Sequence, residues 1–291
     1  MKLRIQDFRF NLLTLFLMVA MNFSLSTASY AAHPLVTDDT GTQGKGKFQV
    51  EVNTEFTFDK ERKEREDTDD DGVEDTVKVD TIKVKGSEIA TVFTYGAIDN
   101  LDIFIEAPYK WSKTKINGVV DPTDPSADTK GISDIAIGAK WRFYEHEGLS
   151  FGLKPSISLP TGNENKGLGN GRASYEILFI STKEIEPWAF HLNLGYTHNN
   201  YKLQEDKDAK RRGIWKASLA AEVEVVKDLK IVADTGIERN EEKGKSTHPA
   251  FILGGLIYSI TESFDVNFGV KGGLNKPADD IAVLAGIAFR F

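Results

Sequence analysis

Apolar and polar residues alternate along much of this chain with the two-residue period of a β-strand. In residues 48–58, the even-numbered positions are Phe, Val or Thr, and the odd-numbered positions are Gln, Glu, Asn or Thr. Successive side chains of a strand point to opposite faces, so this segment predicts a strand with one apolar and one polar face. Residues 281–291 largely follow the same pattern, and the chain ends on the aromatic Phe291.

The pattern recurs at a regular spacing, which predicts a sheet of many strands. Further strands are expected at about residues 89–95, 101–109, 134–143, 149–159, 172–182, 190–197, 216–225, 229–238, 249–260 and 264–274. The strand at 172–182 fits least well, because Leu178 and Ile180 fall on the face that should be polar. With the first and last segments, the total is about twelve strands.

The predicted connections alternate between short and long. Short ones fall at about residues 96–100, 144–148, 183–188, 226–228 and 261–263, and long polar ones at about 59–76, 110–131, 160–171, 199–213, 239–248 and 275–280. Short periplasmic turns and longer outer loops are typical of transmembrane β-barrels. We therefore predict an all-β fold, a closed antiparallel transmembrane β-barrel of about 12 strands with both termini periplasmic. A soluble β-sandwich is the alternative fold.

The N-terminus indicates export. Three basic residues within the first nine precede an uncharged stretch at residues 10–25, as in a secretory signal peptide. The expected organisation is a signal peptide over residues 1–31 and a barrel over residues 32–291, with a cut after Ala28 as the alternative.

Three features of the composition bear on this prediction. The mean hydropathy of −0.31 would suit a soluble protein, but barrel strands carry an apolar residue only at every second position and keep the average low. The net charge of −8, without basic patches, argues against nucleic acid as a partner. The chain has no cysteine, which is compatible with an oxidising compartment.

Several short segments, in order, resemble a known family. They are residues 33–39 (His-Pro-Leu-Val-Thr-Asp-Asp), 44–48 (Gly-Lys-Gly-Lys-Phe), 95–101 (Tyr-Gly-Ala-Ile-Asp-Asn-Leu), 106–109 (Glu-Ala-Pro-Tyr), 131–141, 159–162 (Leu-Pro-Thr-Gly) and 192–196 (Leu-Asn-Leu-Gly-Tyr). This series resembles the outer-membrane family associated with the meta-cleavage pathway of phenol degradation. The resemblance implies a channel or transporter for small molecules, aromatic or hydrophobic ones included, in the cell outer membrane after secretion across the inner membrane.

The same resemblance extends to partners. A closing strand that ends on Phe291 is similar to the terminal strands that the barrel assembly machinery reads in bacterial outer-membrane proteins. The expected partners are therefore outer-membrane lipids, that machinery and a small-molecule solute.

Charged and polar residues on the polar face are candidates to line the lumen. Each of the chosen residues lies within a predicted strand: Glu106, Arg142, Lys154, His191, Glu222 and Asp234. Such residues either give a water-filled path its selectivity or pair with one another and plug the lumen. Both readings stay open at this point.

Two other functions compete with a channel. A membrane-embedded hydrolase of lipids would need a Ser or Asp close to His191, and the sequence places no Ser beside it. A structural or adhesive barrel would pass no solute. We predict a channel and not an enzyme.

An acidic stretch in the first long loop is similar to the front half of a calcium-binding loop, with carboxylates at alternating positions. The candidate ligands are Asp67, Asp69, Asp71 and Asp75. The pattern departs at Lys78, where a bidentate Glu should stand. The two readings are a Ca²⁺ site completed by another segment and a solvated acidic loop; no other cofactor is expected.

Overall fold

The computed structural model describes residues 33–67, 76–117, 119–120 and 128–291, apart from the side chains of 61–67 and 76–80. The predicted signal peptide and the candidate calcium ligands Asp69, Asp71 and Asp75 lie outside the described residues. The described elements are β1 (Phe48–Asp67), β2 (Thr76–Ile98), β3 (Leu101–Ile116), β4 (Asp128–Ile132), β5 (Ile135–His146), β6 (Leu149–Leu159), η1 (Glu164–Lys166), β7 (Ser174–Ile185), β8 (Trp188–His198), α2 (Gln204–Ala209), β9 (Gly213–Val226), β10 (Leu229–Glu238), β11 (Ala250–Thr261), β12 (Phe264–Gly273) and β13 (Ile281–Arg290).

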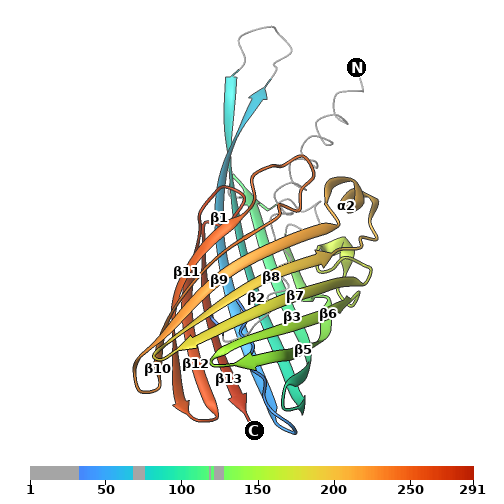
Figure 1. Ribbon diagram of the computed structural model, residues 1–291. Helices are drawn as coiled ribbons and strands as arrows, with labels where there is room; N and C mark the ends of the chain where they lie inside the picture. The colour runs from blue at the N-terminus through green and yellow to red at the C-terminus, as the bar shows by residue number, and fades with distance from the viewer. Residues whose placement is uncertain (1–32, 68–75, 118, 121–127) are drawn as a thin grey trace.

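Twelve of these strands close into one antiparallel barrel (Figure 1). Each ring strand pairs with its neighbours in sequence order, and β13 pairs with β1 from Arg290 opposite Gln49 to Ile281 opposite Phe58. The short strand β4 pairs with β3 above the β3–β5 contact and is extra to the ring. The expectation of a closed antiparallel barrel of about twelve strands is confirmed.

Burial alternates along the strands as the sequence pattern requires. On β1, Glu51 is 4% exposed and Phe56 is 39% exposed, so the polar face points into the barrel and the apolar face points out. The outer surface carries large exposed apolar side chains from every side of the ring, among them Ile103, Phe190, Leu194, Ile231 and Phe268. Leu178 and Ile180 are buried, on the inner side of β7.

Two of the predicted loops were wrong in extent. Residues 59–76 were expected to form a connection, but β1 continues to Asp67 and β2 starts at Thr76. The paired ends of these two strands form a ribbon, the β1–β2 ribbon, that extends past the ring (Figure 1). The predicted loop 110–131 likewise contains the end of β3 and all of β4 except its last residue, Ile132. The β-branched residues Ile82, Val84 and Ile116 pack together in these extended parts of β2 and β3. Residues of this type favour strands, so strand structure continues where apolar and polar residues no longer alternate.

The two ends of the barrel differ. The short turns, at residues 99–100, 147–148, 186–187, 227–228 and 262–263, lie at the end that holds the C-terminus, and the β1–β2 ribbon and α2 lie at the other (Figure 1). At the short-turn end, Phe48 and Phe291 exchange two backbone hydrogen bonds, of 2.8 and 3.0 Å, and their rings stack with centroids 5.5 Å apart. The aromatic terminus thus completes the β1–β13 seam. No helix in the described part of the chain is long and apolar enough to cross a membrane.

The backbone leading into β1 packs closely against the end of β2, and Gly96 makes this approach possible. A Cβ atom at Gly96 would lie 1.8 Å from the carbonyl oxygen of Gly44, whereas one at Gly254 would meet nothing within 4 Å. We expect Gly96→Ala to lower the free energy of unfolding in micelles by about 1–3 kcal/mol. Gly254→Ala is the matched control and should change it little; equal effects in denaturant titrations would contradict this account.

Candidate functional site

Residues 33–43, which we call the plug, lie inside the barrel and not along its wall. His33, Leu35, Thr37, Asp38 and Thr40 are all buried. The segment precedes β1 and has no strand of its own. The alternation of apolar and polar residues does not predict its position in the lumen.

Acidic and amide side chains of the wall hold the backbone of the plug. The Asp234 carboxylate on β10 accepts hydrogen bonds from the Val36 and Thr37 amides at 2.7 and 2.8 Å, and from the Thr37 hydroxyl at 2.7 Å. Asn193 on β8 exchanges two hydrogen bonds with the Asp38 backbone, at 2.9 and 3.0 Å. Because these wall groups lie on different strands, the plug is held from several sides.

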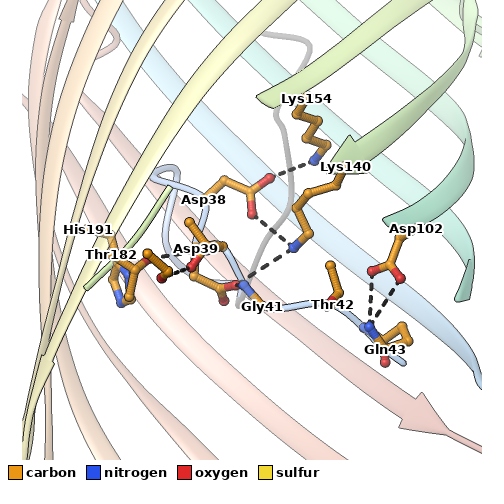
Figure 2. A network of polar contacts seen from close by, with 12 residues as sticks. Asp38, Asp39, Gly41, Thr42, Gln43, Asp102, Lys140, Lys154, Thr182 and His191 are labelled. Carbon is orange, nitrogen blue, oxygen red and sulfur yellow. Dashed lines mark hydrogen bonds and ion pairs between the residues drawn. The ribbon is translucent and has the colours of Figure 1, made fainter. Parts of the chain in front are cut away.

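Ion pairs anchor the plug to the opposite wall (Figure 2). The Asp38 carboxylate, fully buried, lies 2.7 Å from the Lys154 ammonium and 3.5 Å from that of Lys140. Asp39 lies 3.7 Å from Lys140, and Asp102 accepts the Gln43 amide at 3.1 Å. A buried charge is costly without a partner, so these pairs satisfy charges of the plug and the wall together.

Hydroxyl groups also attach the plug to the wall. The Thr40 amide donates to Thr182 Oγ1 at 3.1 Å, and Thr40 Oγ1 lies 2.5 Å from Ser150 Oγ. Thr182 Oγ1 in turn lies 3.0 Å from Nδ1 of the buried His191. The hydroxyl beside His191 therefore supports the plug.

An apolar patch on the inner wall receives the plug side chain Leu35. It is formed by residues of β9, β10, β11 and β13, namely Ala220, Val232, Leu253, Ile257, Ala282 and Leu284. These residues occupy inner-face positions where a water-filled lumen would favour polar side chains. Their presence is the sequence signal that could have revealed an internal segment.

The structure places the six candidate lumen residues in different surroundings. Lys154 and Asp234 bind the plug directly, and His191 reaches it through Thr182. Glu222 pairs with Lys230 at 2.7 Å, and Arg142 pairs with Glu145 at 3.2 Å. Glu106 lies buried on the inner face of β3. Whether these residues line a solute path stays a prediction.

A cavity of about 640 Å³, which we call the vestibule, extends from the plug to the short-turn end. Its lining includes residues of that end, such as Lys47, Arg290 and Phe291, and plug residues such as Asp39. The lining mixes charges of both signs: Lys47, Lys140, Lys154, Lys230 and Arg290 against Asp39, Glu51, Asp102, Glu222, Glu262 and Asp265. The vestibule is therefore a polar chamber closed on one side by the plug.

Nothing in the described residues forms a metal centre of several ligands. No group of three or more His, Cys, Asp or Glu side chains in that part of the chain is placed to hold a metal ion. The Ca²⁺ site predicted around residues 67–75 lies almost wholly outside the described residues and stays a prediction.

A family model described as "Putative MetA-pathway of phenol degradation" matches residues 31–291. The chain belongs to this family. The resemblance inferred from short segments is therefore confirmed over nearly the whole chain. A comparison with curated proteins finds no significant match.

Solved structures support the same architecture for this family member. An outer membrane channel from Pseudomonas putida F1 superposes with a TM-score of 0.63 at 13% identity, covering 87% of this chain and 98% of that one. The KdgM porin has a TM-score of 0.50 at 8% identity, covering 84% and 99% of the two chains. The Pseudomonas putida toluene transporter TodX, at 0.46 and 9% identity over 84% and 89%, is too distant to support an argument. At these identities the similarity establishes the fold alone.

Breaking the Asp38 ion pairs should loosen the plug. Asp38→Asn removes a buried carboxylate and leaves Lys140 and Lys154 without this partner, a change that costs about 3–5 kcal/mol for buried pairs. We expect the amides of Val36 and Thr37 to exchange hydrogen at least about 100-fold faster, measured by mass spectrometry in micelles. Glu176→Gln breaks the 2.9 Å inner-wall ion pair with Lys216 and should leave this exchange unchanged. Unchanged exchange in Asp38→Asn would show that the ion pairs do not hold the plug.

Proposed function

We propose that this protein is an outer-membrane channel that passes small molecules through its barrel, with the plug as its movable obstruction. One observation supports this most directly: a closed ring has an apolar outer surface and encloses a polar vestibule of about 640 Å³. A lipid-facing exterior and a polar interior are the arrangement of transmembrane barrels that conduct solutes.

The same features support a location in the outer membrane. The outward apolar side chains suit lipid, and short turns in such barrels face the periplasm, so we assign the C-terminus to the periplasmic side. The Pseudomonas putida structure is of an outer membrane channel and KdgM is a porin, which agrees with this location. Phe291 is exposed at the end of the chain, where assembly machinery could bind it.

The size and charge of the vestibule indicate the kind of solute. The vestibule is large enough for a small organic molecule and carries charges of both signs. Since the family description concerns phenol degradation, small aromatic compounds with polar substituents are the first class to test. Hydrogen-bonding and charged groups of the vestibule would bind the polar substituents.

The hydrolase alternative gains no support from the surroundings of His191. Its hydrogen-bonded neighbour is the Thr182 hydroxyl, which also accepts the Thr40 amide and so belongs to the attachment of the plug. A nucleophile would need to be free to attack a substrate. A structural or adhesive barrel would pass no solute, so a flux measurement distinguishes it from a channel.

Cross-linking the plug tests both the channel and its gate. The chain has no cysteine, and the hydroxyls of Thr40 and Ser150 lie 2.5 Å apart, so Thr40→Cys with Ser150→Cys places two thiols within disulfide range. In liposome-swelling assays with aromatic, sugar and carboxylate solutes, we expect the reduced double variant to pass small solutes. We expect oxidation to lower that flux at least about tenfold, because the plug is then fixed.

The outcomes of this assay separate the two parts of the proposal. Thr40→Cys alone is the control, and oxidant should not change its flux. Equal flux before and after cross-linking would show that solutes bypass the plug. No flux of any solute in either state would reject the channel and favour a structural barrel.

A charge on the outer wall tests membrane insertion. Phe268, 51% exposed in the middle of β12, faces outward, and Leu274, 59% exposed, lies just past the end of that strand. Phe268→Arg should destabilise the barrel in bilayers by about 2–4 kcal/mol, and Leu274→Arg by about 0–1 kcal/mol, because the penalty falls from the bilayer midplane to its surface. Denaturant titrations in lipid vesicles measure the free energy of unfolding of both variants. Similar small losses for the two variants would contradict a lipid-facing wall.

A further inference from the structure

The plug begins in a recess of the inner wall that three glycines form. Gly255 of β11 and Gly269 of β12 lie opposite each other in the sheet, and Gly286 lies on the adjoining strand β13. A Cβ atom at Gly255 or Gly269 would lie 2.6 or 2.7 Å from the ring of Pro34, and one at Gly286 would lie 2.9 Å from Nδ1 of His33. The wall therefore has room for these two plug residues because it carries no side chains there.

The recess buries the imidazole of His33. The residue is 2% exposed, and its Nδ1 donates a hydrogen bond of 2.5 Å to Oδ1 of Asn267 on β12. Burial lowers the pKa of His33 to about 4, because an imidazolium would lose its hydration in the recess; the hydrogen bond to Asn267 and the charge of Glu55 offset only part of this effect. The seated plug therefore holds His33 in its neutral form.

The charged groups of the wall around His33 are already paired. Glu55 on β1 and Lys271 on β12 both act on His33, and they lie 2.6 Å from each other. Asp265, further along the inner face of β12, pairs with Arg290 of β13 at 2.7 Å. The remaining strand of the recess, β11, contributes a glycine. A proton on His33 would thus add a positive charge to a set of wall charges that already balance.

The other ionisable side chains of the plug are the carboxylates of Asp38 and Asp39. Asp38 lies 2.7 Å from the Lys154 ammonium. Burial would raise the pKa of Asp39, but Lys140 and other cations outweigh it and lower that pKa to about 2. Histidine is the side chain whose ordinary pKa lies in the mildly acidic range, so His33 is the plug residue that can respond there.

We propose that mild acid releases the plug, because His33 takes up a proton when it leaves the glycine recess. The seated plug binds this proton less readily than the released plug, in which His33 regains the ordinary pKa of about 6.5. The seated state is therefore favoured above about pH 6.5 and becomes less stable relative to the released state as the pH falls towards 4. This acid response rests on the movable plug of the proposed channel and adds the condition under which the plug moves.

Hydrogen exchange of the purified protein in micelles tests the acid response. The protection factor of the Val36 and Thr37 amides, corrected for the exchange rate of an unfolded peptide at the same pH, should be about 10–30-fold lower at pH 5 than at pH 7.5. His33→Asn keeps an amide donor near the position of Nδ1 and takes up no proton, so its protection should be equal at the two pH values. His191→Asn is the matched control, because His191 is the other buried histidine next to the plug attachment, and the loss of protection should persist in it.

Two outcomes of this experiment would overturn the acid response: equal protection of the wild type at both pH values, and a loss that survives in His33→Asn. The measurement needs no solute flux. A barrel that passes no solute would therefore reject the channel, whereas the acid response is judged by the protection of the plug alone.

Nuclear magnetic resonance of the imidazole groups gives a readout that does not depend on how well the variant seats its plug. The His33 signal is the one missing from the His33→Asn spectrum. We expect it to show a neutral ring in the wild type at about pH 6, where the imidazole of an unfolded peptide is mostly charged. A charged His33 in the seated plug at this pH would overturn the proposal, because the recess would then not resist the proton.

Discussion

The closure of the backbone hydrogen-bond ring at the β1–β13 seam is the constraint on which the rest of the structure depends. Unpaired N–H and C=O groups cost several kcal/mol each in a lipid environment, so a wall of this kind is stable only without edges. The seam pairs ten residues of β1 with β13 and ends on the Phe48–Phe291 pair. Once the backbone is satisfied in this way, the side chains are free to divide into an apolar exterior and a polar interior.

The polar interior places charged side chains in the lumen, and the plug supplies partners for them. Without residues 33–43, Asp234, Lys140 and Lys154 would each lose contacts that compensate their charge in the lumen. In the structure, plug amides bind Asp234, and Asp38 binds the two lysines. The plug therefore completes the inner wall as well as blocking it. In the proposed opening, water would have to replace these contacts, which would link opening to hydration of the interior.

The ring was predictable from sequence because strand period, turn spacing and face polarity are local properties. The plug was not, because alternation assigns residues to a face without indicating what that face contacts. Leu178 and Ile180 were recognised as exceptions on the polar face, and Val232, Leu253 and Leu284 form the patch under Leu35. The loop predictions failed where β1 and β2 pair beyond the ring, because strands there no longer separate an inner from an outer face. Glu106 was identified as an inward residue, and the structure places it buried on the inner face of β3.

Lys154 connects the plug to a buried acid of the wall. Its ammonium group pairs with Asp38 of the plug at 2.7 Å, lies over the Phe104 ring at 4.7 Å from the ring centre, and acts electrostatically on Glu106. A change in the position of Asp38 therefore alters the electrostatic field at Glu106. Because a low-dielectric interior tolerates few uncompensated charges, the seating of the plug and the electrostatic state of Glu106 are parts of one charge balance.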